Sequence, residues 1–224
     1  MKAAKIALGF ACGLALSACN MVVSSEPWLT ASVDAPVMKP GLWAMLEDED
    51  CEVDADLALE FWPDCAEATV ISDDGSWYSQ KEDSDEWEMI TPVLEYDDPV
   101  IGQIELPKEI AAKEGGEALF LYFALQPERY DSQGKISAMR YWLVQCGPLS
   151  TSGRTGFRST DAPFDGLTVH EDNCEAESIE ALRNAAALSL DLPDGSKPAR
   201  WISKTGAWFR GGTPAGGASG FEEP

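Results

Sequence analysis

Two apolar segments in the middle of the chain constrain the fold more than any other feature. In residues 118–125 and again in residues 136–146, side chains at both odd and even positions are apolar or aromatic. Short runs rich in β-branched and aromatic residues favour strands, and apolar residues on both faces indicate strands that are covered on both sides. Asp131-Ser132-Gln133-Gly134 between them is typical of a turn. The sequence therefore predicts a central antiparallel hairpin at the core.

The rest of the chain adds shorter elements of the same kind. Strands are expected at 41–46, 68–72, 76–80, 87–90, 100–106, 199–203 and 207–209, with residues 57–62 ambiguous and 147–173 an irregular loop. Pro107 suits the first position of a helix that Gly115-Gly116 ends, and Asp172 with Glu175 resembles a capping box for a second. The prediction is a mainly β (α+β) fold: a single antiparallel β-sheet domain, sandwich- or barrel-like, with two short helices at about 107–114 and 174–189. The order of strands is not derivable from these patterns.

The first eighteen residues carry an export signal. Lys2 and Lys5 precede an apolar run from Ile6 to Leu16, and small residues follow. The run is too short for a membrane span, which needs about 20 apolar residues. Leu16-Ser17-Ala18-Cys19 resembles the lipobox of bacterial lipoproteins. The resemblance implies cleavage before Cys19 and a lipid anchor on Cys19. In that family an aspartate at the next position commonly signals inner-membrane retention, so Asn20 implies the outer membrane, with the domain facing the periplasm.

These features divide the chain into four parts. Residues 1–18 are the expected signal peptide, 19–40 a tether, 41–210 the globular domain and 211–224 a disordered tail. The alternative for the tether is that Trp28 and Leu29 dock on the domain. Four cysteines then remain in the exported domain, and an even number predicts two disulfides. Three pairings are possible. We favour Cys51–Cys65 and Cys146–Cys174, because each joins neighbours in sequence. A zinc site is the alternative, but no C-x-x-C spacing supports it.

The charge of the chain excludes several partners. The full sequence has 16 Lys and Arg against 39 Asp and Glu, a formal charge of −23; loss of Lys2 and Lys5 with the signal takes it to −25. Phosphate binding requires a basic footprint, so a nucleic-acid partner is not expected. Asp48, Asp50, Asp54 and their neighbours form an acidic run at 47–56, but the glycine and glutamate of a calcium loop are missing. We expect no metal or cofactor.

Few residues offer catalytic chemistry. His170 is the sole histidine, and a serine would have to use it together with Asp161, Asp165 or Asp172. Arg154 and Arg158 lie close together in the sequence and are candidates to bind an anion, but ion pairing with nearby acidic residues is the commoner role of surface arginines. Carboxylate pairs are defined by their separation in space, which the sequence does not give. No complete catalytic set is present, so no catalytic residue is assigned.

Three functions follow as hypotheses. The first is a non-enzymatic lipoprotein that reaches the membrane through its N-terminal lipid and binds an envelope protein, a polymer or a small ligand. The second is a carboxylate- or His170-dependent hydrolase. The third comes from Gly41-x-Trp43, which resembles the short signature near the first strand of lipocalins. It implies a carrier of apolar ligands, and it requires a closed barrel with a hollow interior.

Overall fold

The computed structural model describes residues 20–32, 34–80, 87–113, 118–149, 160, 162–170, 173–193 and 195–203. In this part of the chain, ten strands form one curled antiparallel sheet, which two short α-helices and a separate two-stranded hairpin accompany. The predicted mainly β fold with two short helices is therefore confirmed. Among these residues, no helix combines the length and the apolar character needed to cross a bilayer.

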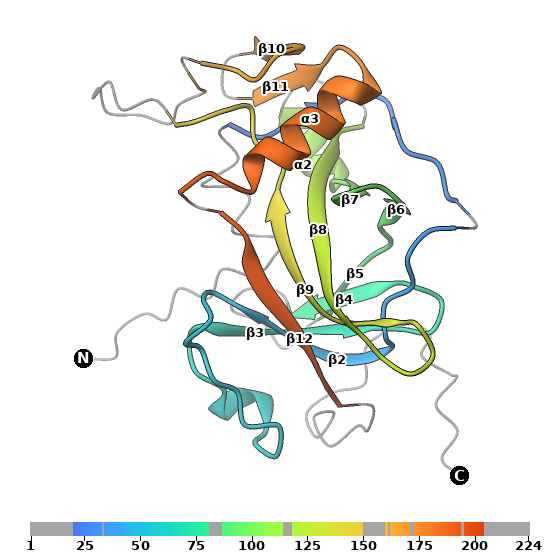
Figure 1. Ribbon diagram of the computed structural model, residues 1–224, viewed down its shortest axis with the longest axis vertical. Helices are drawn as coiled ribbons and strands as arrows, with labels where there is room; N and C mark the ends of the chain where they lie inside the picture. The colour runs from blue at the N-terminus through green and yellow to red at the C-terminus, as the bar shows by residue number, and fades with distance from the viewer. Residues whose placement is uncertain are drawn as a thin grey trace.

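The large sheet has the strand order β5-β4-β3-β2-β12-β9-β8-β7-β6, with the short β1 paired to β8. Its strands are β1 (Val23–Ser24), β2 (Gly41–Leu46), β3 (Ala66–Ile71), β4 (Trp77–Gln80), β5 (Trp87–Ile90), β6 (Val93–Glu95), β7 (Val100–Glu105), β8 (Phe120–Tyr130), β9 (Ile136–Leu143) and β12 (Lys197–Ser203). In Figure 1, β8 and β9 run along the long axis, and β2, β3 and β4 cross it at the lower end. The β8–β9 hairpin is the predicted central pair.

The upper end of Figure 1 carries a hairpin and a helix. They are β10 (Leu167–His170) with β11 (Asn173–Ala176), and α3 (Ile179–Ser189). The helix α2 (Lys108–Lys113) precedes β8, and the 3-10 turn η1 (Leu59–Phe61) lies at the lower end. The second helix therefore begins later than the sequence suggests. Ser178, not Asp172, is its N-cap, and its hydroxyl accepts a hydrogen bond from the Ala181 amide at 3.1 Å. Residues 173–176 pair with β10 instead.

Apolar side chains fill both faces of the sheet. The inner face holds Trp43, Phe123 and Met139, each at most 1% exposed. The outer face of β8 and β9 packs against α3, where the Trp142 indole donates to the Ala186 carbonyl at 2.8 Å. The expectation that both faces of the central strands are covered is thus confirmed. The outer face of β2 is covered by the loop that Cys51 and Cys65 close.

Gly102 on β7 lets the inner face close over Phe123. A Cβ atom built at Gly102 would lie 2.1 Å from the Cζ atom of the Phe123 ring, closer than real Cβ contacts allow. The two residues are direct partners across β7 and β8, and the ring also packs against Trp77 with centroids 5.6 Å apart. The large ring therefore takes the space that a side chain at residue 102 would need.

The filled inner face bears on the lipocalin-like hypothesis, which required a closed barrel with a hollow interior. In the described part of the chain the strand path runs from β5 to β6 without a pairing between these two ends. Trp43 is fully buried in the core, with its indole donating to the Lys39 carbonyl at 2.8 Å. The geometry that the hypothesis needs is not met, and we do not carry it further.

The acidic run is attached to the sheet. The Glu49 carboxylate forms ion pairs with Arg140 of β9 and with Arg200 of β12, the latter at 3.0 Å, and Arg140 also contacts Glu128 at 3.1 Å. These side chains are one third to one half exposed, so each pair contributes at most about 1 kcal/mol. They join the loop around Cys51 to the two strands at the centre of the sheet order.

Candidate functional site

Residues 20–29 are part of the domain and form one wall of the candidate site. The sequence suggests a tether from 19 to 40, but Asn20, Met21, Val22 and Leu29 are buried. Val23 and Ser24 pair with Leu121 and Phe120 of β8. Of the two suggested docking residues, Leu29 is buried and Trp28 packs partly buried against the outer core.

Two buried polar side chains of the sheet hold this segment. The Gln103 side-chain oxygen accepts hydrogen bonds from the Trp28 and Leu29 amides, at 2.8 and 2.9 Å. The Tyr122 hydroxyl lies 2.6 Å from the Ser24 hydroxyl. Burial raises the pKa of Tyr122 to about 12, against the opposing effect of the Ser24 hydrogen bond. The sequence analysis missed this docking, and the one signal that could have indicated it is a glutamine inside the apolar strand 100–105.

The wall borders an open groove of about 370 Å³, lined by Ser25, Glu26, Pro27, Trp28 and Glu175. Its size falls in the usual range for small-ligand sites. Glu26 and Glu175 come from the N-terminal segment and from β11, so two carboxylates 149 positions apart in sequence line one groove with an indole. Such a set suits a ligand with a positively charged group, because carboxylates and aromatic faces both attract cations.

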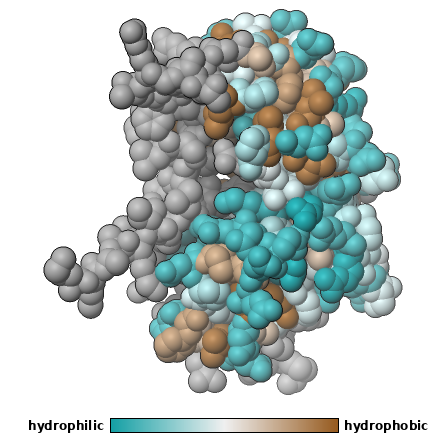
Figure 2. Space-filling model, turned by 60° about the vertical axis from the view of Figure 1, so that its left-hand side comes forward, coloured by the Kyte–Doolittle hydropathy of each residue, from teal (hydrophilic) through white to brown (hydrophobic). Residues whose placement is uncertain are grey.

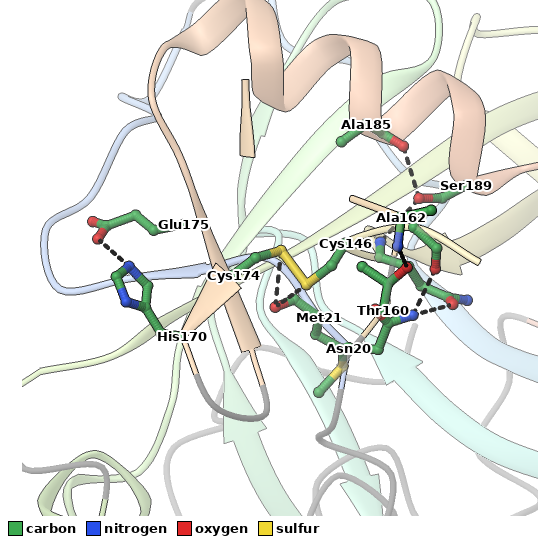
Figure 3. Close-up of a disulfide and its surroundings, with 12 residues drawn as sticks. Asn20, Met21, Cys146, Thr160, Ala162, His170, Cys174, Glu175, Ala185 and Ser189 are labelled. Atoms are coloured by element: carbon green, nitrogen blue, oxygen red, sulfur yellow. Dashed lines mark hydrogen bonds and ion pairs between the residues drawn. A yellow bond between two sulfur atoms is a disulfide. The ribbon is translucent and has the colours of Figure 1, made fainter. Parts of the chain in front are cut away.

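His170 lies beside this groove on β10. Its Nε2 atom is 4.0 Å from a carboxylate oxygen of Glu175, and Figure 3 shows the two side chains facing each other. The imidazole is largely exposed, and 4.0 Å exceeds hydrogen-bond distance. Ser25, His170 and Glu175 are residue types of a hydrolytic triad, yet no hydrogen bond joins Ser25 to His170 in the described contacts. The arrangement supports binding better than nucleophilic catalysis.

The structure places the other sequence-selected residues as follows. Cys51–Cys65 and Cys146–Cys174 are both disulfides, which confirms the predicted pairing. Asp165 is described, and among the described residues no hydrogen bond or ion pair joins it to His170. Cys19, the two loop arginines Arg154 and Arg158, and the acids Asp161 and Asp172 lie outside the described residues, as do 207–209 and the tail. In the part that is described, no three His, Cys, Asp or Glu side chains gather as metal ligands would.

The comparisons with known proteins give no relative. No protein-family model, no curated protein and no solved structure matches this chain. The function therefore rests on the residues and on the geometry of the domain.

Replacement of Tyr122 by phenylalanine tests how the groove wall is held. We expect Tyr122→Phe to lower the free energy of unfolding by about 1 kcal/mol, because the Ser24 hydroxyl loses a buried partner. Urea denaturation measures the change. Tyr130→Phe is the matched control: Tyr130 is 54% exposed, and surface changes stay within about 0.5 kcal/mol. Equal effects of the two substitutions would contradict the role given to Tyr122.

Proposed function

We propose that this chain is an exported bacterial lipoprotein, anchored through Cys19 to the outer membrane and facing the periplasm, whose domain is a non-enzymatic binding protein. The lipobox-like Leu16-Ser17-Ala18-Cys19 and the following Asn20 support the anchor and its membrane. The two disulfides suit an oxidising compartment such as the periplasm. A nucleic-acid partner does not fit the acidic composition.

The groove is the observation that carries the binding role. It combines Trp28 with Glu26 and Glu175 in a volume suited to a small ligand or to one side chain of a larger partner. A net negative chain attracts cations over long range and so favours the encounter. The ligand class is therefore a compound or a chain segment that carries amine or guanidinium groups, from an envelope protein, a polymer or a free small molecule.

Titration calorimetry with spermidine tests the proposal. The mature domain should release or absorb heat with a saturable isotherm, and the double variant Glu26→Gln, Glu175→Gln should lose it. Glu60→Gln removes one charge from an exposed site on η1 and should keep the isotherm. If the double variant binds as well as the unchanged domain, the groove is not the site. If Glu60→Gln weakens spermidine binding as much as the double variant does, the binding reflects only general attraction to an acidic protein.

A hydrolase remains the second candidate because Ser25, His170 and Glu175 gather at the groove. A chromogenic ester panel, run on the mature domain and on His170→Ala, separates the two functions. Turnover that disappears in His170→Ala would replace the binding proposal. No turnover above the buffer blank is the result that the binding proposal expects.

A further inference from the structure

The described chain enters the fold at the residue that follows Cys19. Asn20 is 1% exposed, and its side-chain amide donates to the Gly147 carbonyl at 2.7 Å and to the Gln145 side chain at 3.3 Å. Its own carbonyl accepts a hydrogen bond from the Cys146 amide at 2.9 Å. The backbone at Asn20 has φ +84°, a left-handed conformation that asparagine tolerates better than most residues. Residue 20 is therefore fixed by both its side chain and its backbone.

Met21 and Val22, the next two residues, are also held against the domain. The Met21 carbonyl oxygen lies 3.4 and 3.7 Å from the sulfurs of Cys146 and Cys174, as Figure 3 shows; these are packing contacts, because disulfide sulfurs carry no hydrogen. Met21 bridges to Gln145, and the Val22 amide donates to the Val144 carbonyl at 2.8 Å. The Cys146–Cys174 disulfide thus lies directly beneath the first described residues.

The fixed position of Asn20 also restricts the position of Cys19, because the two residues are joined by one peptide bond. Consecutive Cα atoms are about 3.8 Å apart, so a lipid on Cys19 is attached one residue from a fixed point of the domain. A flexible 20-residue tether would instead let the domain range over roughly 25 Å. With no such tether, the surface around Asn20 is the part of the domain nearest to the bilayer.

Only part of that surface has the composition that a bilayer interface favours, because the exposed Asp165 directly follows the uncharged residues. The described residues 145–149, 160 and 162–164 include no charged side chain, and Leu149 is 49% exposed. Leu188 is 40% exposed and adjoins Ser189, whose hydroxyl accepts a hydrogen bond from the Gln145 amide. Figure 2 shows apolar side chains gathered at the upper and lower ends of its face, with hydrophilic ones across the middle.

The acidic run lies at the other end. Residues 47–56 and η1 occupy the lower part of Figure 1, opposite α3, β10 and β11. Acidic side chains are repelled by anionic lipid headgroups, so this end is favoured away from the membrane. The charges therefore favour this direction, whereas exposed apolar residues occur at both ends, since Leu57 and Phe61 in the loop that Cys51 and Cys65 close are 45% and 65% exposed.

We infer that the domain stands on the membrane in one fixed orientation, with the surface around the buried Asn20, including Leu149 and Leu188, against the lipid and the Cys51–Cys65 loop pointing away. The inference rests on the proposed anchor at Cys19. It goes beyond that anchor because it names the face that meets the bilayer and the face left free for a partner.

Fluorescence quenching in vesicles tests the orientation. The full-length lipidated protein is reconstituted in phosphatidylethanolamine–phosphatidylglycerol vesicles that contain spin-labelled quencher lipids. A fluorescent amino acid is placed at Leu188 in one variant and at Phe61, which is 65% exposed, in another. We expect strong quenching at position 188 and none at 61. Insertion of twenty Gly and Ser residues between Cys19 and Asn20 should abolish the quenching at 188.

The outcomes separate the orientation from the anchor. Equal quenching at the two positions, or quenching at 188 that survives the insertion, would overturn the orientation while the protein still sediments with the vesicles. Protein that stays in the supernatant, as Cys19→Ala is expected to do, would instead refute the anchor and with it the premise. Circular dichroism of each labelled variant confirms that the fold is intact before the comparison is made.

Discussion

Joint replacement of Cys146 and Cys174 by alanine is expected to lower the free energy of unfolding by about 3.5 kcal/mol from loss of loop closure alone. The disulfide joins residues 28 positions apart, and the chain-entropy cost of an open loop grows with that separation. Both cysteines are almost fully buried in the cluster that includes Trp142 and Leu182, so the missing sulfurs add a cavity cost of about 1 kcal/mol. Urea denaturation under oxidising conditions measures the total.

The second disulfide is the control. Cys51→Ala with Cys65→Ala opens a loop of separation 14, which corresponds to about 3 kcal/mol. Cys51 is buried but Cys65 is only half buried, so the added cavity cost should be smaller than for Cys146 and Cys174. The first double variant should therefore lose more stability, and it should also speed hydrogen exchange at the Val22 backbone amide, which donates to the Val144 carbonyl beside this disulfide. A larger loss from the Cys51–Cys65 variant would contradict this account.

The sequence predicts the elements whose signal is local. The apolar segment 136–146, the strand-like segment 87–90 and the helix after Pro107 all depend on neighbours within a few positions, and the structure contains β9, β5 and α2 there. The cysteine pairing also follows from short separations. Such local patterns predict the secondary structure correctly because burial and intrinsic propensity favour the same element at these positions.

The order of strands depends on contacts that no local pattern records. β12, the last strand in the described residues, inserts between β2 and β9 and so joins two elements that lie far apart in sequence. Any of the apolar strands presents the same backbone donors and acceptors at its edge, and the choice among partners is made by packing of the whole sheet. Strand order was therefore beyond the reach of the sequence.

The groove was missed for a related reason. Residues 25–29 have no periodicity, and their position is fixed by Gln103 and Tyr122, which belong to strands about 75 and 100 residues later. Glu175 reaches the groove only because residues 173–176 form β11 rather than the first turn of a helix. The available signals were a glutamine within an apolar strand and Ser178 directly before the apolar helix face, where an N-cap is preferred.

A second large effect is expected from Glu67→Gln, which should stabilise the domain at pH 8 by up to about 3 kcal/mol. Glu67 lies on β3 opposite Met45, on the inner face of the sheet. Burial raises the pKa of its carboxyl from 4.5 to about 7; Lys197 opposes the shift and Glu47 adds to it. One pKa unit corresponds to about 1.4 kcal/mol, and partial exposure of the side chain lowers the figure.

The direction follows from proton binding in the two states. Between pH 4.5 and about 7 the unfolded chain has lost the Glu67 proton while the folded domain still holds it. The contribution of Glu67 to stability is therefore fully present below pH 4.5, falls through this window, and stays low above about pH 7. Glutamine keeps the shape and cannot ionise, so the variant should lack this fall.

The difference in stability between Glu67→Gln and the unchanged domain, measured by urea denaturation at pH 4.5, 6 and 8, isolates the one carboxyl from the other titrating groups. We expect a difference near zero at pH 4.5 that grows to its full value at pH 8. Glu105→Gln is the matched control, because Glu105 is exposed at the end of β7 and should give a small difference at every pH. A difference for Glu67→Gln that stays constant with pH would show that its carboxyl ionises alike in the folded and unfolded states.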